Sequence, residues 1–273
     1  MSRGWLLDRI LGLRPASTRD VAVHADIAVP MRDGVVSRAD RYVPAGREDA
    51  PVVVVRSPYG RKGLWGRLYW LPLARRGYQV VIQSCRGTAD SEGEFVPFAE
   101  RDDSHDTVSW LRQQPWYPGR FATFGPSYAG LAQWAVVDAA GDELVAMTAV
   151  LTSSALVRSM FFGGAPAQQA WLSWSAVIAA QQDVGAGFRA LIRARTVGAR
   201  KVVRALRAVP LGHADQAAVG RTLRWWQEWL AHHDPDDEYW QRYDQSAVVP
   251  LVRAPVAMVT GWHDLFLPWQ LAD

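Results

Sequence analysis

The fold is decided by ten residues in the middle of the chain, FATFGPSYAG at positions 121–130. This stretch begins as a short apolar run, turns sharply around Ser127, and continues in a helical pattern through Trp134 and Val137. A serine at such a strand-to-helix turn sits in strained backbone with its hydroxyl exposed, and small neighbours let the strand and the helix approach closely. The pattern predicts a nucleophile elbow, a turn that presents a reactive serine.

The amide groups that follow Ser127 support the same interpretation. They belong to a helix N-terminus that points toward the serine hydroxyl, where they can stabilise an oxyanion. The general motif is G-x-S-x-G, whereas here Ala129 holds the fifth place and Gly130 follows it. On this motif alone, a helix N-cap serine without a catalytic role explains the residues equally well.

Apolar runs on both sides of this stretch predict a sheet. Four of them, without clean alternation, lie at 52–55, 78–82, 145–151 and 256–260. Such runs are typical of strands that are covered on both faces. Helical stretches lie at about 65–76, 102–114 and 127–140. Because their spacing suits right-handed crossovers between parallel strands, the chain is predicted to be an α/β protein.

Two further segments frame this core. Residues 20–43 alternate apolar and polar side chains around Asp33-Gly34, which predicts an opening β-hairpin. From about Ser153 to Tyr243 helical spacing with many Ala and Trp residues predicts an all-helical insertion. We therefore expect three parts: residues 1–152 as the first part of the core, 153–243 as a helical cap, and 244–273 as an incomplete second part of the core.

The composition is that of an ordinary globular protein, with 273 residues, 49% hydrophobic and 21% charged. A chain of this length needs no disulfide or structural metal for stability, and the single Cys85 cannot form an internal bridge. A net charge of +3 does not suggest a nucleic-acid-binding protein. No run reaches the ~18 apolar residues of a membrane span, and residues 5–11 predict a short amphipathic helix rather than a secretory signal. We expect a cytoplasmic protein.

Motifs at several other places accompany the elbow. They are VPMRDG at 29–34, RSPY at 56–59, RG at 86–87, SEGEF at 91–95 and GWHD at 261–264. With the elbow, which reads G-x-S-Y-x-G, they span nearly the whole chain, and in this order they resemble the cocaine esterase and X-prolyl dipeptidyl-peptidase family of α/β-hydrolases. The resemblance implies an α/β-hydrolase core that hydrolyses esters or amides.

The resemblance also implies a role for each matching residue. Ser127 would be the nucleophile, and the backbone N–H of Tyr128 and the phenol of Tyr59 would be the two oxyanion donors. Asp264 would be the acid that orients the base. The position of Asp264 supports this role independently, because it lies just past a buried strand, at the edge where open α/β sheets place their sites.

The substrate-binding residues rest on the same resemblance. Trp174 and Phe266 resemble aromatic positions that line the acyl site, and an uncharged acyl group is favoured because no acidic cluster follows Asp264. Each assignment has a structural alternative. Tyr59 can be a packed loop aromatic, Asp264 a helix-capping carboxylate, and the two aromatic residues plain core.

The base of such a site is the missing element. In α/β-hydrolases a histidine follows the acid in the sequence, and no histidine follows Asp264. The six histidines are His24, His105, His213, His232, His233 and His263, and none is placed to substitute. Because His263 adjoins Asp264, the two side chains would diverge. We therefore expect this chain to be the N-terminal portion of a longer enzyme and to be inactive alone, with a degenerate hydrolase as the alternative.

Two groups of acidic residues and histidines could be mistaken for metal sites. They are Glu100, Asp102, Asp103, His105 and Asp106, and His232, His233, Asp234, Asp236, Asp237 and Glu238. The first is predicted to be an acidic helix start and the second a turn around Pro235. Both are expected to be solvated structure without a metal.

Taken together, these patterns predict a serine hydrolase that acts on a small-molecule ester or amide through an acyl-Ser127 intermediate and needs no cofactor. The sequence leaves homo-oligomerisation open. The alternative function is a noncatalytic binding protein that keeps the hydrolase fold and an apolar pocket.

Overall fold

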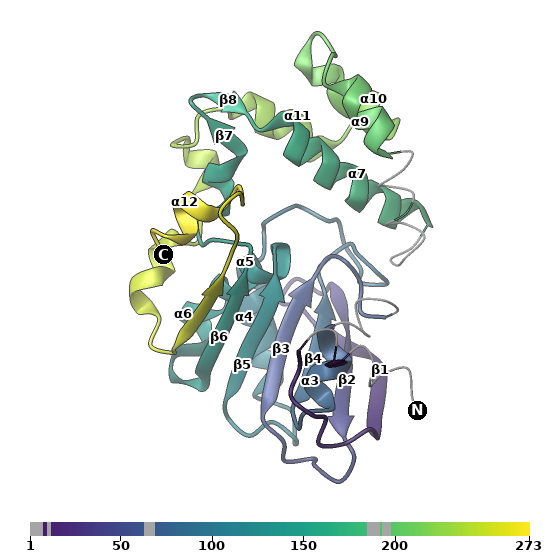
Figure 1. The fold of residues 1–273 in the computed structure, drawn as a ribbon, viewed down its shortest axis with the longest axis vertical. Coiled ribbons are helices and arrows are strands. Elements are labelled where there is room, and N and C mark those ends of the chain that lie inside the picture. Colours follow the sequence, from purple (N-terminus) through teal and green to yellow (C-terminus); the bar gives the residue numbers. More distant parts are fainter. Residues whose placement is uncertain (1–7, 10–11, 63–68, 185–191, 193–197) are drawn as a thin grey trace.

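A computed structural model describes residues 8–9, 12–62, 69–184, 192 and 198–273, and Figure 1 shows its arrangement. A twisted sheet with flanking helices forms one part, and a group of helices lies over one end of that sheet. Most of the helix expected at residues 5–11 lies outside the described residues. Within these ranges we find no helix that is both long and apolar enough to cross a bilayer.

Seven strands form one sheet in the order β1-β2-β4-β3-β5-β6-β9. Their bounds are β1 Val21–Pro30, β2 Val36–Pro44, β3 Val52–Ser57, β4 Gln79–Ser84, β5 Phe121–Pro126, β6 Leu144–Val150 and β9 Val256–Val259. The first two strands are antiparallel to each other and β2 is antiparallel to β4, whereas the pairs from β4 to β9 are all parallel. The predicted α/β class with a mostly parallel sheet is confirmed.

The opening hairpin forms where the Asp-Gly turn predicts it. Pro30 faces Val36 in the ladder, and the N–H of Met31 donates to the carbonyl of Val35 at 2.8 Å. Gly34 has φ +86°, a left-handed conformation that glycine adopts without steric cost. The turn therefore sets the register of β1 against β2, and β2 joins the hairpin to the rest of the sheet through β4.

The central strands are buried on both faces, as their unbroken valine runs predict. Every residue of β3 and β4 is buried. Val52 and Val54 pack in one apolar cluster, and Val53 and Val55 pack in another on the opposite face. Alternate side chains of one strand thus supply two cores, which is the arrangement that a parallel sheet between two helical layers requires.

Short helices cover the sheet. They are α3 Leu71–Ala74, α4 Arg101–Leu111, α5 Tyr128–Trp134, α6 Val137–Ala140 and α12 Leu267–Gln270. The helix expected at 127–140 is interrupted at Ala135 and Val136, so it forms two helices. Of the helix expected at 65–76, residues 65–68 lie outside the described part.

Residues 151–255 are here called the β6–β9 connection. The helices of its described part lie over the carboxyl ends of the strands, and its last residues run down beside α6 to the start of β9 (Figure 1). These helices are α7 Gln168–Val184, α9 Ala199–Ala205, α10 Ala214–Val219 and α11 Arg224–Ala231, with 3-10 turns at Leu156–Met160, Leu211–His213, Glu238–Trp240 and Ser246–Leu251. The expectation of an all-helical segment is wrong, because β7 Phe161–Phe162 and β8 Ala165–Pro166 form a small ribbon. Gly163 and Gly164 close it with φ of +58° and +80°, which other residues adopt at a cost.

Candidate active site

Ser127 lies between β5 and α5 with φ 55° and ψ −123°. This left-handed backbone is strained for a residue with a side chain and marks sites where the surroundings hold the chain in place. The serine N–H donates to the carbonyl of Val150 at 2.8 Å, and the carbonyl of Ser127 accepts from the N–H of Leu131 at 3.0 Å. The hydroxyl makes no capping hydrogen bond to α5, so the N-cap alternative does not describe it.

Two glycines allow this turn to form. A Cβ on Gly125 would lie 2.6 Å from the Cβ of Ala129, and a Cβ on Gly130 would lie 2.3 Å from Cγ2 of Thr152. Both distances are shorter than any ordinary contact, so the strand and helix pack too closely for a side chain at either position. The alanine in the fifth place of the motif fits because Gly125 leaves room for it.

Tyr59 follows β3 and brings its phenol to the same point. The phenol is hydrogen-bonded with the side chain of Ser127, with the indole of Trp174 and with the backbone N–H of Tyr128. The Trp174 indole donates to it over 3.1 Å. Burial raises the pKa of Tyr59, partly offset by these hydrogen bonds. The phenol therefore stays protonated at neutral pH and can donate to an oxygen beside Ser127.

The side chain of Tyr128 is buried beneath the turn. Its hydroxyl donates to Oε1 of Glu100 at 2.6 Å and accepts from the N–H of Phe98 at 2.8 Å. Burial, and then the charge of Glu100, raise the pKa of Tyr128 well above its ordinary value. The two hydrogen bonds hold the residue whose backbone N–H reaches the Tyr59 phenol.

An apolar cavity of about 170 Å³ opens next to Ser127. It is lined by Phe98, Ser127, Tyr128, Leu156, Ala170, Trp171, Trp174, Leu265 and Phe266. Trp174 and Phe266, the two residues expected to bind substrate, both line it. The β6–β9 connection supplies Leu156, Ala170 and the tryptophans, and the other walls come from Phe98, from residues 127–128 and from residues 265–266. Four separate segments of sequence thus build the cavity.

Asp264 lies at the same edge of the sheet, in the turn between β9 and α12. Its Oδ1 accepts a hydrogen bond of 2.7 Å from the N–H of Phe266, and its own N–H donates to the carbonyl of Gly261 at 3.0 Å. This is the contact expected of a capping carboxylate. Its neighbours Leu265 and Phe266 line the cavity beside Ser127, whereas Asp264 is not among the described lining residues.

The histidines lie away from this cavity. None is among its described lining residues. His105 is 2.8 Å from a carboxylate oxygen of Asp138, and His232 is 2.9 Å from one of Asp237. His263 is exposed, one residue before Asp264. The described residues that line the cavity therefore include Ser127 but none of the six histidines.

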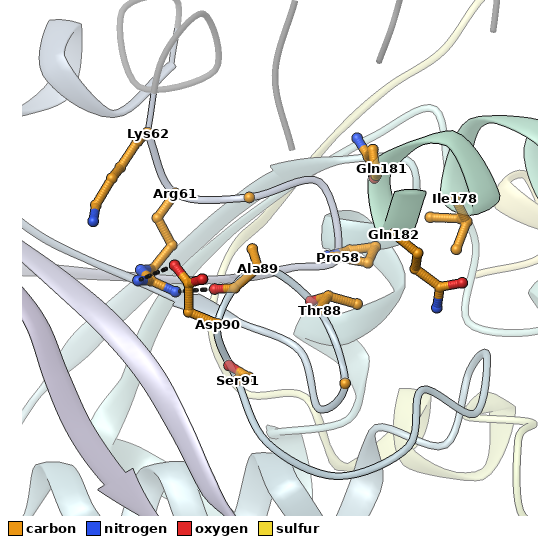
Figure 2. A pocket seen from close by; sticks show the side chains of 12 residues that line it. Pro58, Arg61, Lys62, Thr88, Ala89, Asp90, Ser91, Ile178, Gln181 and Gln182 are labelled. Atoms are coloured by element: carbon orange, nitrogen blue, oxygen red, sulfur yellow. Dashed lines mark hydrogen bonds and ion pairs between the residues drawn. The ribbon is translucent and has the colours of Figure 1, made fainter. Parts of the chain in front are cut away.

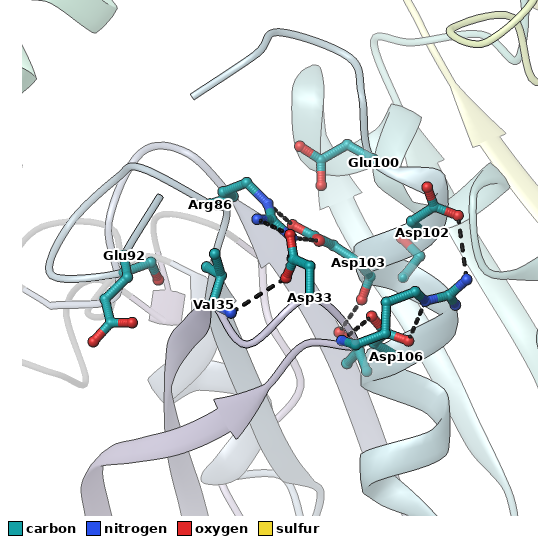
Figure 3. Close-up of polar contacts among 12 residues, drawn as sticks. Asp33, Val35, Arg86, Glu92, Glu100, Asp102, Asp103 and Asp106 are labelled. Atoms are coloured by element: carbon teal, nitrogen blue, oxygen red, sulfur yellow. Dashed lines mark hydrogen bonds and ion pairs between the residues drawn. The ribbon is translucent and has the colours of Figure 1, made fainter. Parts of the chain in front are cut away.

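The first acidic group is only partly solvated, which corrects the sequence-based expectation. Asp102 is exposed, but Glu100 and Asp103 are 3% and 4% exposed. Asp103 lies 2.6 Å from Arg86, which also pairs with Asp33 at 2.7 Å (Figure 3). Buried carboxylates need such partners, since an isolated buried charge is strongly disfavoured.

Arg56 is the residue from which a buried carboxylate such as Glu100 could have been predicted from the sequence. It lies at the end of a buried strand and is only 2% exposed. A charged side chain in such a place requires a buried partner, but the sequence does not say which carboxylate fills that role. Within the described ranges, no group of three or more acidic, histidine or cysteine side chains is arranged to hold a metal ion.

The structure also contains a larger cavity of about 630 Å³. Residues of 58–62 and 87–91 and the end of α7 line it, and Figure 2 shows Arg61 on one side and Gln181 and Gln182 on the other. Arg61 is paired with Asp26 at 2.7 Å and with Asp40 at 3.1 Å. Ser127 is not among the described lining residues of this larger cavity, whereas it does line the smaller apolar cavity.

Comparisons with known proteins show which proteins this chain resembles. Residues 33–273 match the model of a family described as X-Pro dipeptidyl-peptidase (S15 family). The chain is 34% identical over 264 residues to the cocaine esterase of Rhodococcus sp. (strain MB1 Bresler), a match that covers 90% of this chain and 45% of the esterase. The chain thus spans about half the length of that relative.

Two solved structures share the fold. An α-amino acid ester hydrolase superimposes with a TM-score of 0.66 at 20% identity, covering 94% of this chain and 47% of the hydrolase. An aminopeptidase from a marine sediment archaeon, Thaumarchaeota archaeon, superimposes with a TM-score of 0.62 at 21% identity, covering 91% and 46%. At these identities the likeness shows the fold alone.

Proposed function

Because the chain belongs to the X-Pro dipeptidyl-peptidase (S15) family, we propose that it carries the nucleophile and the oxyanion donors of a serine hydrolase. The reaction is hydrolysis of an ester or amide through a covalent acyl-Ser127 intermediate. One observation supports this most directly. The Tyr59 phenol is hydrogen-bonded to both the Ser127 side chain and the Tyr128 N–H, at a strained turn that opens into an apolar cavity.

In the first step Oγ of Ser127 attacks the carbonyl carbon of the substrate, and its proton passes to a base. The carbonyl oxygen becomes an oxyanion, which accepts hydrogen bonds from the Tyr59 phenol and the Tyr128 N–H. The bond to the leaving group then breaks, and the leaving group takes the proton from the base. Water hydrolyses the acyl-serine by the same steps in reverse, which restores the Ser127 hydroxyl.

We assign the acid to Asp264 and the base to a histidine outside these 273 residues. The six histidines of the chain lie away from the cavity, and the chain covers 45% of the cocaine esterase it resembles. By this proposal the 273 residues alone hydrolyse esters at or near the uncatalysed rate. The full-length protein is the active form.

The cavity indicates the acyl group. Its walls are aromatic and aliphatic and bring no charged side chain among the described residues, so an uncharged, apolar acyl group fits. A cavity of similar volume in another protein binds benzene, so about 170 Å³ accommodates a six-membered ring. We propose that the β6–β9 connection acts as the cap that closes this site.

The test is reaction of the full-length protein with a fluorophosphonate probe, followed by mass spectrometry. We expect a single adduct on Ser127, and Ser127→Ala should abolish both the adduct and ester hydrolysis, a loss on the order of 10⁵-fold or more. Ser109→Ala, at an exposed serine of α4, is the matched control and should label normally. Failure of a folded full-length preparation to label would contradict the proposal. Ligand binding that persists in Ser127→Ala, without an adduct in either form, would indicate a noncatalytic binding protein.

A further inference from the structure

We propose that Glu100 is a positioning residue for the reaction at Ser127. Together with Arg56 it fixes the Tyr128 side chain, and through it the oxyanion-binding N–H and one wall of the acyl cavity. This inference rests on the proposed function. It concerns Glu100 and Arg56, which do not line the cavity themselves, although Glu100 contacts two residues that do, Tyr128 and Phe98.

Glu100 is held from two sides. Its Oε2 lies 2.7 Å from Nη1 of Arg56, and both side chains are almost completely buried. Its Oε1 accepts the hydrogen bond of 2.6 Å from the Tyr128 hydroxyl. The same Nη1 of Arg56 donates to the backbone carbonyl of Glu100 at 3.1 Å and to Oγ of Ser104 at 2.6 Å. The carboxylate therefore cannot move without breaking several buried contacts.

The pair connects the two oxyanion donors. Arg56 lies on β3, three residues before Tyr59, and Oγ of Ser57 accepts the N–H of Tyr59 at 3.1 Å. Tyr128 is the first residue of α5, which follows β5, the strand that pairs with β3. Glu100 thus links the end of β3, which carries the phenol, to the start of α5, which carries the N–H. A shift at the pair would change the distance between the two donors.

The same contacts also hold the wall of the cavity. The Phe98 N–H donates to the Tyr128 hydroxyl, and the two rings stack with centroids 5.6 Å apart. The ring of Tyr128 is nearly parallel to that of Trp174, at 6.1 Å and 3°. Because Tyr128 contacts both Phe98 and Trp174, which also stack on each other, its anchor helps to fix the position of the aromatic wall.

Energetics favour a positioning role over a purely stabilising one. Removing two charges from water costs several kcal/mol per ion, so a buried ion pair is often no more stabilising than apolar residues of similar volume. Catalysis, by contrast, is sensitive to position, since a displacement of ~1 Å can lower a rate by about 10²-fold.

The experiment compares Glu100→Gln with Glu100→Ala in the full-length protein. Both variants remove the carboxylate that lies 2.7 Å from Arg56 and leave it only the more distant Asp103, at 3.7 Å. Only glutamine keeps an oxygen that accepts the Tyr128 hydroxyl. We expect Glu100→Ala to lower kcat by on the order of 10- to 10²-fold, and Glu100→Gln to recover most of that loss at a similar Tm. Affinity for a trifluoromethyl ketone, which mimics the tetrahedral state, should fall by the same factor as kcat/KM.

A second variant covers the case in which Glu100→Ala does not fold. Tyr128→Phe keeps the ring and the backbone N–H and removes only the hydroxyl that meets Glu100 and Phe98. We expect it to lower kcat by about 10-fold. The matched controls are Glu143→Ala and Tyr117→Phe, because Glu143 accepts from Tyr117 at 2.6 Å and pairs with Arg112 at 2.7 Å, in a group that does not line the cavity. These controls should lower Tm without lowering kcat beyond about twofold.

The inference is overturned if Glu100→Ala and Glu100→Gln lose activity equally and in proportion to Tm, or if Tyr128→Phe keeps the wild-type kcat. Fluorophosphonate labelling of the wild-type protein is measured alongside. An unlabelled wild-type protein overturns the proposed function and this inference with it, whereas a labelled wild type with unaffected variants overturns the inference only.

Discussion

The ends of β5 and β9 bring two residues of the proposed site to the same edge of the sheet, and they are held very differently. β5 lies between β3 and β6, and the turn at Ser127 is held by hydrogen bonds from β6 and α5. β9 pairs with β6 alone among the described strands, and three of its four residues are exposed. Asp264 beyond it is held by contacts within its own turn.

The difference between the two strand ends shows which part of the proposed site is held by the 273 residues of this chain. Buried contacts fix Ser127 and Tyr128, the proposed nucleophile and one proposed oxyanion donor, and Trp174 holds the phenol of Tyr59, the other proposed donor, beside the apolar cavity. The turn at Asp264 keeps its shape through local hydrogen bonds. It lies at the surface, since the side chain of Trp262, two residues before Asp264, is 87% exposed. The variants below, in the full-length protein, are designed to break this contrast or to sharpen it.

The largest effect is expected at the β9 end. Asp264→Asn keeps an oxygen that accepts the Phe266 N–H, so the turn and the Tm should be preserved. If Asp264 orients the base, kcat falls by about 10⁴-fold, because an amide stabilises the wrong tautomer of the histidine. Steady-state kinetics and thermal unfolding decide between the two roles. Normal turnover would leave Asp264 with the capping role alone.

The next effect is expected at the β3 end, from Tyr59→Phe. The variant removes one oxyanion donor and should lower kcat by about 10²- to 10³-fold with a small change in KM. Since burial raises the pKa of Tyr59, the phenol keeps its proton above the pH at which an exposed tyrosine ionises, so the deficit should be the same at neutral and mildly alkaline pH. A deficit that disappears on raising the pH would argue against phenol donation.

The smallest effect concerns packing and compares two glycines. Gly130→Ala places a Cβ 2.3 Å from Thr152 and should destabilise the fold by about 1–3 kcal/mol. Gly261→Ala, in the turn before Asp264, meets nothing within 4 Å and should change stability by less than about 0.5 kcal/mol. Chemical denaturation measures both. Equal effects would mean that the two turns are equally tightly packed.

Local patterns in the sequence were sufficient for much of the fold. The Asp33-Gly34 turn, the valine run of β3 and the small residues around Ser127 each predict an element that the structure contains. The ribbon at Phe161–Phe162 was missed because two-residue strands are too short to show a period. The prediction that the first acidic group is solvated was wrong for Glu100, which is buried. The pattern of a helix start does not reveal which of its side chains faces a buried arginine.

What the sequence by itself determined is the set of backbone conformations, because turn residues and apolar periodicity act between neighbours a few positions apart. Only the tertiary structure decided which side chains meet. Trp174 bonds Tyr59 across 115 positions, and Arg56 reaches Ser104 across 48. Such contacts depend on how strands and helices pack, and the burial that fixes them is a property of the whole molecule rather than of any segment.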